Sequence, residues 1–533
     1  MPPVYALTPL LVLGVLNVFL LALEIPRHWG FGPNVLAFEA LALTGAFMLL
    51  PRRRWTLVAA LVTGAVLLVL ALMAAIDALA RMSLSRPLNL YLDYPLITSV
   101  YDLAVGNLPP LLAMGALAAL VVALLALWAG GTVLLALLRA DGPGPVRRTS
   151  GVVLLAAGIA GIVTFHTSPV VPRAISPGVT MIADQAQWAA RTHHESRAFA
   201  ALLDADDSDA ARPLDGLRDT DVILGFIESY GVSAVFDDRY APVIRPRLID
   251  LEQRVDNAGL HMVTGTLDAP MFGGQSWLAH AATLSGLWIE NQLRYELMLN
   301  TQRDTLVQDF QATGHTTMQI MPAITQDWPE GSWYGFDTTR EAGDIPYQGP
   351  PFNWVTMPDQ YTWWYFEQSL RQPAQQPVFG MLALVSSHAP WVPILPVIEA
   401  WERIGDGEIF RQWEGKGETP EQLWRDHDRV RAHFALSVDY ALNVAAGYAE
   451  RYVDEDTLLI VLGDHQPAQL ITGEYPSPAV PVHVISGDPA LLEPFRERGF
   501  VTGGTPVTEQ GLAGMDRLRG WLREDFGTAP QDD

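Results

Sequence analysis

Three short apolar runs of the sequence end in side chains of the kinds that enzymes use in catalysis. Glu228 and Ser229 follow the run 222–227, Ser386 to His388 follow the run 378–385, and Asp464 and His465 follow the run 457–462. Carboxylates and imidazoles transfer protons, and hydroxyl groups act as nucleophiles. Each group also has a plainer interpretation: Glu228 can pair with an arginine, Asp464 and His465 can close a turn, and His388 can be a buried histidine.

A fourth candidate is Ser276, which follows Gly273, Gly274 and Gln275 and precedes an apparent helix. Backbone N–H groups and the helix dipole at a helix N-terminus favour a bound anion such as phosphate. Taken alone, Ser276 is also compatible with an ordinary N-cap. We expect His280, one helical turn later, on the helix surface.

The apolar runs alternate with helical stretches such as 277–290 and 432–451. Continuous apolar strands that alternate with helices indicate a parallel sheet covered on both faces. In open sheets of this kind, ligands bind outside the carboxyl ends of the strands. We therefore expect the three strand ends to converge on one crevice, although they are distant in the sequence.

The first third of the chain has the composition of a membrane region. Half of the whole chain is hydrophobic and 17% is charged, whereas a typical soluble protein has about 25% charged residues. Apolar stretches cover about 4–23, 33–50, 55–80, 108–138 and 150–165. A helix of about 20 residues crosses a bilayer. We expect five spanning helices, with four as the alternative because the last stretch is short.

Arginine residues set the expected orientation of these helices. Arg52 to Arg54 lie between the second and third stretches, and Arg139, Arg147 and Arg148 lie between the fourth and fifth. Both clusters are expected on the cytoplasmic side, because positively charged loops stay there. With five spans, the residues after about 166 lie outside the cytoplasm; with four spans, they lie inside it.

Composition excludes several classes of function. The net charge of −24 argues against a nucleic-acid-binding protein with a broad basic face, so we expect no nucleic-acid partner. The absence of cysteine excludes thiol nucleophiles, cysteine-bound zinc, iron–sulfur clusters and disulfides. Lysine occurs once, at Lys416, which argues against a Schiff-base mechanism.

The order of these features resembles the alkaline phosphatase/sulfatase superfamily. Within it, the chain is similar to the membrane-anchored branch of lipoteichoic acid synthases, phosphoglycerol transferases and phosphoethanolamine transferases. The motifs that carry the resemblance are Phe226-Ile-Glu-Ser-Tyr230, Gly274-Gln-Ser276 with Leu284-Ser-Gly286, Ser387-His-Ala-Pro390 and Gly463-Asp-His465. The resemblance implies an N-terminal α-helical membrane bundle followed by an α/β sulfatase-like domain with a mostly parallel sheet. We expect a membrane domain at 1–165, a connector helix and acidic linker at 166–220, and an extracytoplasmic catalytic domain at 221–533.

The resemblance also implies roles for individual residues. Glu228, Ser276, Asp464 and His465 match the family's ligands for one divalent metal ion, for which we favour Mn²⁺ and consider Mg²⁺ or Zn²⁺ as alternatives. Ser276 matches the covalent nucleophile, and His388 matches a histidine that contacts the substrate phosphate. The transferases commonly have Thr where this chain has Ser276, which puts the substrate class in doubt more than the reaction type. Sulfate-ester hydrolysis is disfavoured, because Ser276 is not followed by the x-Pro-x-Arg of formylglycine sulfatases.

The function implied by the resemblance is that of a metal-dependent phosphotransferase in the cell membrane. It is expected to move a phosphoglycerol or phosphoethanolamine head group from a phospholipid, through a phosphoserine, to a glycan, lipid or polymer acceptor of the envelope. A phosphoester hydrolase and a catalytically silent lipid-binding sensor are the alternatives. We expect Trp277 and Trp391 in the substrate pocket. The aromatic segment 326–364 is either a donor or acceptor surface or a packed loop.

Overall fold

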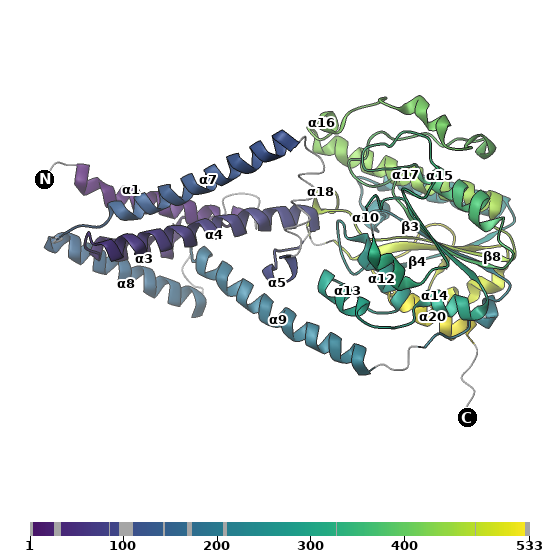
Figure 1. Cartoon of the computed structure of the whole chain (residues 1–533), viewed down its shortest axis with the longest axis horizontal. Coiled ribbons are helices and arrows are strands. Elements are labelled where there is room, and N and C mark those ends of the chain that lie inside the picture. Colours follow the sequence, from purple (N-terminus) through teal and green to yellow (C-terminus); the bar gives the residue numbers. More distant parts are fainter. Residues whose placement is uncertain are drawn as a thin grey trace. The chain divides into compact units, whose positions relative to one another are not determined.

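The computed structural model describes residues 4–25, 33–84, 86–94, 110–141, 144–167, 173–205, 210–326, 328–474 and 476–527. The chain divides into two compact units, one of residues 1–82 with 86–197 and one of residues 83–85 with 198–533. The first unit consists mainly of helices, and the second is built around one large sheet (Figure 1).

Several helices of the first unit are apolar along most of their length. The helices that begin in this unit are α1 (Val4–Ala22), α3 (Phe38–Leu49), α4 (Arg54–Leu84), α5 (Leu90–Asp93), α7 (Pro110–Leu137), α8 (Pro145–Thr167) and α9 (Pro177–Ala205). Within the described residues, three stretches are long and apolar enough to cross a membrane: Arg54–Leu84, Leu111–Leu137 and Pro145–Thr167. The apolar stretches Leu7–Ala22 and Phe38–Leu49 are shorter.

The difference from the five expected spans has a structural reason at α3. Its preceding residues, Leu36–Ala37 (β1), pair in parallel with Ala174–Ile175 (β2) instead of continuing the helix. The helix therefore has 12 residues, which cover about 18 Å at 1.5 Å per residue. The fifth expected stretch, 150–165, is extended on its N-terminal side by Pro145 to Thr149 and reaches spanning length.

The two arginine-rich loops of the first unit lie together. The amide of Arg52 donates to the carboxylate of Asp141 (2.9 Å), and the Arg52 guanidinium donates to the carbonyl oxygen of Arg139 (3.0 Å). The amide of Ala140 donates to the carbonyl oxygen of Leu50 (3.2 Å). Loops that touch each other lie on the same side of any membrane that the helices cross.

Helices α3 and α8 approach each other at glycine residues. A Cβ atom at Gly45 would lie 2.4 Å from the amide nitrogen of Leu155, and one at Gly158 would lie 2.4 Å from that of Ala42. In lipid, helices associate through such close contacts between small residues, since apolar side chains gain little by leaving the acyl chains. The two glycines thus allow the backbones to touch.

The second unit contains a nine-stranded sheet of order β10-β4-β9-β8-β3-β7-β5-β6, with β11 paired to β4. The strands are β3 (Asp221–Ile227), β4 (His261–Asp268), β5 (Thr316–Met321), β6 (Thr338–Glu341), β7 (Val378–Leu384), β8 (Thr457–Gly463), β9 (Ala479–Ser486), β10 (Val501–Thr502) and β11 (Ala513–Gly514). Strands β8, β3, β7, β5 and β6 are adjacent and parallel, whereas β9 and β10 are antiparallel to their neighbours. The expected mostly parallel sheet is confirmed.

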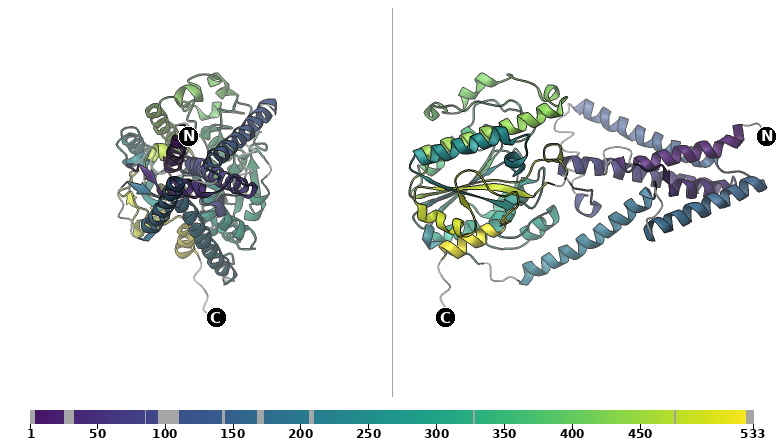
Figure 2. Two further views of the ribbon diagram at one scale, coloured as in Figure 1. Left: turned by 90° about the vertical axis from the view of Figure 1, so that its left-hand side faces the viewer. Right: turned by 180° about the vertical axis from the view of Figure 1, so that it is seen from behind.

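Helices cover both faces of this sheet (Figure 2). Residues of α11 (Ala241–Asn257), α15 (Asp359–Tyr365) and α17 (His427–Tyr452) form one core with Ile223 and Ile227 of β3. Residues of α12 (Ser276–Ser285), α14 (Leu306–Thr313) and α20 (Arg517–Phe526) form the other core with Val222, Leu224 and Phe226. Successive side chains of a strand point to opposite faces, so a continuous apolar run supplies both cores.

Short helices complete the second unit. They are α10 (Ser233–Phe236), α13 (Gln292–Leu299), α16 (Pro420–Leu423), α18 (Gln469–Thr472) and α19 (Glu493–Glu497). The 3₁₀ helices are η1 (Asp215–Leu217), η2 (Pro329–Tyr334), η4 (Trp401–Arg403), η5 (Glu408–Trp413) and η6 (Pro489–Leu492), and η3 (Phe366–Arg371) is a π-helix. Most of them lie in the connections between strands and larger helices.

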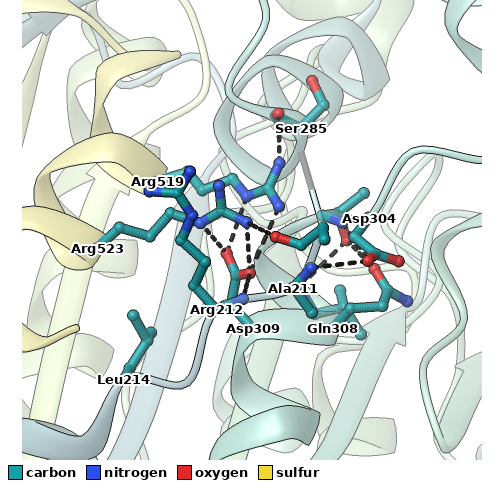
Figure 3. A network of polar contacts seen from close by, with 12 residues as sticks. Ala211, Arg212, Leu214, Ser285, Asp304, Gln308, Asp309, Arg519 and Arg523 are labelled. Atoms are coloured by element: carbon teal, nitrogen blue, oxygen red, sulfur yellow. Dashed lines mark hydrogen bonds and ion pairs between the residues drawn. The ribbon is translucent and has the colours of Figure 1, made fainter. Parts of the chain in front are cut away.

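The second half of the acidic run 204–216 is anchored to the second unit, although Arg212 and Asp215 stay exposed. The amide of Arg212 donates to Asp309 Oδ1 (2.9 Å), and the amide of Leu214 donates to the Thr313 hydroxyl (2.7 Å), both on α14 (Figure 3). Leu214 is fully buried. Residues 206–209 of the expected linker lie outside the described residues.

Candidate metal centre and nucleophile

Glu228 and Asp464 are the first residues after two neighbouring parallel strands, β3 and β8, which end at the same register position. Ile227 of β3 is opposite Gly463 of β8, so the next residues are Glu228 and Asp464. The amide of Ser229 donates a hydrogen bond to Asp464 Oδ1 (2.8 Å) and links the two strand ends. Glu228, Asp464 and His465 are buried, and each offers a ligand atom within 4.8 Å of the other two. Two of the three expected strand ends therefore meet here.

Hydrogen bonding determines which nitrogen of His465 faces this group. Nδ1 lies 2.8 Å from the carbonyl oxygen of Gln466, and a carbonyl only accepts, so Nδ1 carries the proton. Nε2 of the neutral ring then holds the lone pair, 3.4 Å from Glu228 Oε1 and 3.8 Å from Asp464 Oδ2. Metal-binding histidines are typically oriented by such a bond from their second nitrogen.

The hydroxyl of Ser276 completes the group. Its Oγ lies 3.1 Å from Glu228 Oε2 and 3.2 Å from His465 Nε2. Ser276 is the first residue of α12, and Gln275 in the left-handed conformation (φ 67°) occupies the N-cap position. The N-cap interpretation of Ser276 is therefore wrong, since its side chain points at Glu228 and His465 instead of capping the helix.

The spacing of these donors fits one divalent cation. Ligands that lie about 2.0–2.2 Å from a common ion are about 2.8–3.1 Å from their neighbours in octahedral geometry and about 3.3–3.6 Å apart in tetrahedral geometry. The separations of 3.1, 3.2 and 3.4 Å among the donors of Ser276, Glu228 and His465 fall within or between these ranges, and Asp464 Oδ2 lies slightly farther out, 3.8 Å from His465 Nε2. Oxygen donors with one imidazole nitrogen suit Mn²⁺, Mg²⁺ or Zn²⁺. The residues present therefore fit a single metal ion.

The buried charges in this group perturb one another strongly. Burial and the charge of Glu228 raise the pKa of Asp464 to about 7. Burial also disfavours ionised Glu228, but the imidazoles of His465 and His388 lower its pKa to about 2. Burial likewise opposes a charged His465, yet the carboxylates of Asp464 and Glu228 raise its pKa. Two buried carboxylates competing for positive partners are a favourable setting for a divalent cation.

His388 reaches the group from the other neighbour of β3. Its loop follows β7, and the Ser387 hydroxyl donates to the carbonyl oxygen of Glu228 (2.6 Å). Nδ1 of His388 lies 2.5 Å from the carbonyl oxygen of Ala389, so Nδ1 carries the proton. A substrate contact by Nε2 stays a prediction. The third expected strand end thus lies beside the other two.

The two tryptophans expected in a substrate pocket occupy different environments. Trp277 is 37% exposed, and its Nε1 donates to Gln292 Oε1 (3.1 Å). Trp391 is buried, its Nε1 donates to the carbonyl oxygen of Ser387 (2.7 Å), and its ring stacks on Trp424 at 5.8 Å. Trp391 therefore supports the His388 loop from inside. A substrate contact by Trp277 stays a prediction.

Most of the aromatic segment 326–364 belongs to the core, in agreement with the packed-loop interpretation. Tyr334 and Trp363 are buried, and Trp328, Trp333 and Trp364 pack against buried clusters. Trp354 is different, because it is 54% exposed and its ring centroid lies 6.2 Å from that of His388. Composition alone does not distinguish this ring from its buried neighbours.

His280 is buried, so its expected surface position is wrong. Its ring packs against Phe226 at 4.4 Å, because α12 is covered on almost every side. Burial lowers its pKa to about 3, so the ring is neutral at physiological pH. Neither ring nitrogen has a hydrogen-bond partner among the described residues.

No protein-family model and no curated protein matches this sequence. Among solved structures, the chain is similar to the integral membrane protein lipooligosaccharide phosphoethanolamine transferase A (EptA) from Neisseria meningitidis, with 12% identity, a TM-score of 0.47 and coverage of 97% of this chain and 95% of that chain. It is also similar to the phosphoglycerol transferase GacH from Streptococcus pyogenes in complex with sn-glycerol-1-phosphate, with 15% identity, a TM-score of 0.37 and coverage of 62% and 80%. For the lipoteichoic acid synthase LtaP from Listeria monocytogenes, the identity is 11%, the TM-score 0.37 and the coverage 62% and 79%.

Proposed function

We propose that this protein is a membrane-anchored, metal-dependent phosphotransferase that moves a phospholipid head group to an acceptor of the cell envelope. The observation that carries the proposal is the position of the Ser276 hydroxyl, 3.1 Å from Glu228 and 3.2 Å from His465, next to buried potential metal ligands. A serine hydroxyl is a weak nucleophile at neutral pH and needs activation by its surroundings. This site offers such surroundings, and the motif order resembles that of the superfamily described above.

Glu228, Ser276, Asp464 and His465 would hold the metal ion, with Mn²⁺ favoured over Mg²⁺ and Zn²⁺. A divalent cation held there stabilises the alkoxide form of a serine and offsets negative charge on phosphoryl oxygens. Side chains of the protein carry out the nucleophilic attack and bind the phosphoryl group.

Ser276 Oγ would attack the phosphorus of the lipid in line, while the bond from phosphorus to the diacylglycerol oxygen breaks. Glu228 Oε2 accepts the hydrogen bond of the hydroxyl and orients Oγ, and the hydroxyl proton passes to solvent as Oγ attacks. The departing diacylglycerol oxygen takes up a proton, and the head-group phosphate stays on Ser276 as a phosphoserine. His388, when doubly protonated, would donate from Nε2 to a phosphoryl oxygen as its charge develops.

The second half-reaction decides between transfer and hydrolysis. The hydroxyl of a glycan, lipid or polymer acceptor would attack the phosphoserine along the same line and release Ser276. Holding an acceptor in place is worth roughly 7–11 kcal/mol. Trp277 and Trp354 are exposed rings close in sequence or space to the proposed catalytic residues, so they are candidates for this positioning. Attack by water instead would make the protein a phosphoester hydrolase.

The membrane helices favour a lipid as the donor. We propose a multi-pass protein of the cell membrane with residues 221–533 as the extracytoplasmic catalytic domain, 1–165 as the membrane domain and 166–220 as the connector. Three stretches of spanning length support the membrane location, and the paired arginine-rich loops support a common cytoplasmic side. Phosphatidylglycerol and phosphatidylethanolamine are the proposed donors.

The test uses the purified full chain with phosphatidylglycerol or phosphatidylethanolamine that is radiolabelled in the head group. Reactions with Mn²⁺, Mg²⁺, Zn²⁺ or EDTA should show label on the protein and release of diacylglycerol only when metal is present. Ser276→Ala should abolish both, whereas Thr283→Ala and Ser285→Ala should keep both, because these hydroxyls bond within or next to α12.

Label retained on Ser276→Ala would contradict the nucleophile. If the wild-type protein, with acceptors present, forms only free glycerol phosphate or phosphoethanolamine, hydrolysis replaces transfer as its function. Release of neither product from any lipid would reject the proposal.

A further inference from the structure

A second segment of the chain holds the His388 loop (residues 385–392) at both ends. At the first end, Asp359 Oδ1 accepts hydrogen bonds from the amides of Val385 (2.7 Å) and Ser386 (2.8 Å). At the other end, Asn353 Nδ2 donates to the carbonyl oxygen of Val392 (2.6 Å). Residues 353–359 and the His388 loop are therefore joined by hydrogen bonds on both sides of His388.

The contact at Asp359 is reciprocal and fully buried. Asp359 is the first residue of α15, and its own amide donates to the Ser386 hydroxyl (2.8 Å), which thereby caps that helix. The side chain has no solvent exposure, and no arginine, lysine or histidine among the described residues forms an ion pair with it. Burying a carboxylate without hydrogen bonds is costly. The two loop amides therefore stabilise Asp359 Oδ1, whereas Oδ2 is buried with no hydrogen-bond partner among the described residues.

Between its two ends, the loop is attached to the candidate metal centre. The Ser387 hydroxyl donates to the carbonyl oxygen of Glu228, and the Trp391 indole donates to the carbonyl oxygen of Ser387. The Trp354 ring, from the segment between Asn353 and Asp359, lies beside the His388 ring. A shift of the loop at Asp359 would consequently move His388 relative to Glu228.

We infer that Asp359 is a positioning residue that holds His388 against the substrate phosphate by fixing the amides of Val385 and Ser386. This inference rests on the proposed function, because it assumes that His388 contacts the phosphoryl group. Asp359 itself does not touch the substrate. Hydrogen bonds from an amide to a carboxylate are charge-assisted and stronger than those to a neutral acceptor. Asp359→Asn keeps an acceptor oxygen at this position but should hold the loop less tightly.

A double-mutant cycle tests whether Asp359 acts through His388. Asp359→Asn should lower kcat about 10–100-fold, as replacement of a partner that orients a catalytic group typically does, with a smaller change in KM. In a His388→Gln background, the same substitution should lower kcat by less than about threefold, because the group that it positions is gone. An equal fold-change in both backgrounds, or no loss in the single variant, would overturn the inference.

Asp337→Asn is the matched control. The Asp337 carboxylate also accepts from a backbone amide, that of Thr317 (2.8 Å), but it precedes β6 and therefore lies at the opposite ends of the parallel strands. This variant should change kcat by less than about twofold in either background.

Two milder variants keep the inference testable if Asp359→Asn does not fold. Ser386→Ala removes the hydroxyl that accepts from the Asp359 amide, and Asn353→Gly removes the second anchor while keeping a residue that tolerates φ of 60°. Both should lower kcat in the wild-type background and have little effect in the His388→Gln background. Additive losses would contradict the positioning role.

Hydrogen exchange separates this inference from the proposed function. If the wild-type protein turns over no phospholipid, the proposed function fails, and the anchor is judged by exchange of the Val385 and Ser386 amides in the full chain. Faster exchange at these amides in Asp359→Asn, with no change in Asp337→Asn, supports the anchor. Unchanged exchange at Val385 and Ser386 rejects it.

Discussion

Two residues at the candidate site have backbone conformations that ordinary residues seldom adopt. Ser229, next to Glu228, has φ of 57°, and Gln275, next to Ser276, has φ of 67°. Each such residue costs of order 1–3 kcal/mol and persists where the surrounding structure holds it, often at functional sites. Here each unusual residue turns the chain directly beside a proposed metal ligand.

The first prediction concerns the pH dependence of the metal-free protein. The pKa of Asp464 is about 7 in the folded state and about 3.9 in an unfolded chain. Between about pH 3.9 and about pH 7, the folded protein therefore keeps a proton on Asp464 that the unfolded chain has released. The contribution of Asp464 to the free energy of unfolding is fully present below about pH 4 and is lost as pH rises through about 7. The raised pKa of His465 acts in the same direction. His280 and His483, whose pKa values burial lowers to about 3, act in the opposite direction, so the test compares wild type with Asp464→Asn. In EDTA, the Tm of wild type relative to that of Asp464→Asn should fall from about pH 5 to about pH 8.

Metal should reverse this trend, because a cation replaces the protons on its ligands. Saturating Mn²⁺ should raise Tm more at about pH 8 than at about pH 5. Asp464→Asn is the control, since its amide releases no proton and the variant should lack the loss of Tm that Asp464 causes at rising pH in EDTA. An equal metal-induced shift in wild type and Asp464→Asn would argue against this ligand.

At the scale of elements, the parallel strands β8, β3 and β7 explain why the candidate residues meet. Ile227 is opposite Gly463 on one side and Leu384 on the other. The chain therefore leaves all three strands at one edge, with Glu228 in the middle. Helix α12 adds Ser276 to this edge through a tight turn at Gly273 and Gly274, whose φ values of 69° and 143° suit glycine.

The second prediction concerns the packing of α3 against α8. Gly158→Leu should destabilise the membrane unit by about 1–3 kcal/mol, the usual cost of overpacking, because a Cβ there would lie 2.4 Å from the Ala42 nitrogen. Gly115→Leu in α7 is the control, since a Cβ there would meet no described atom within 4 Å. Thermal stability in detergent would measure both. Equal melting temperatures for the two variants would contradict the packing.

The third prediction concerns the buried ion pairs of Asp309. Arg519 and Arg523 of α20 both donate to its carboxylate, which also accepts the amide of Arg212 (Figure 3). Asp309→Ala should cost about 3–5 kcal/mol in the free energy of unfolding, because it leaves a buried guanidinium at Arg519 without its anion. Denaturant unfolding would measure the loss. Arg523 is less deeply buried, so Arg523→Gln should cost less, and the reverse order would contradict this account.

At the scale of the whole molecule, the fourth prediction concerns topology. Reporter fusions after Ala205 should be active only outside the cytoplasm, and fusions after Ala140, in an arginine-rich loop, should be active only inside. The reason is that positively charged loops remain cytoplasmic and α8 lies between the two fusion points with spanning length. The same compartment for both fusions would mean that α8 does not cross the membrane.

Much of the architecture could be predicted from the sequence because its signals are local. Apolar runs of strand length gave the central strands, and long apolar stretches gave the membrane helices. Glu228, Ser276, His388, Asp464 and His465 were identified as candidates from their types and positions, and their expected roles came from the resemblance to the superfamily. A residue's exposure has no comparable local signal, so His280 and most of the aromatic segment were harder to place.

The sequence by itself determined which elements form and which side chains have the chemistry, since both depend on residue type and short-range spacing. Only the tertiary structure decided which of them share a site. It turned Ser276 away from the helix cap, exposed Trp354 while burying Trp363, and brought Asp359 to the amides of Val385 and Ser386. These outcomes depend on contacts between residues far apart in the chain, and such contacts are fixed by strand order and packing rather than by local sequence.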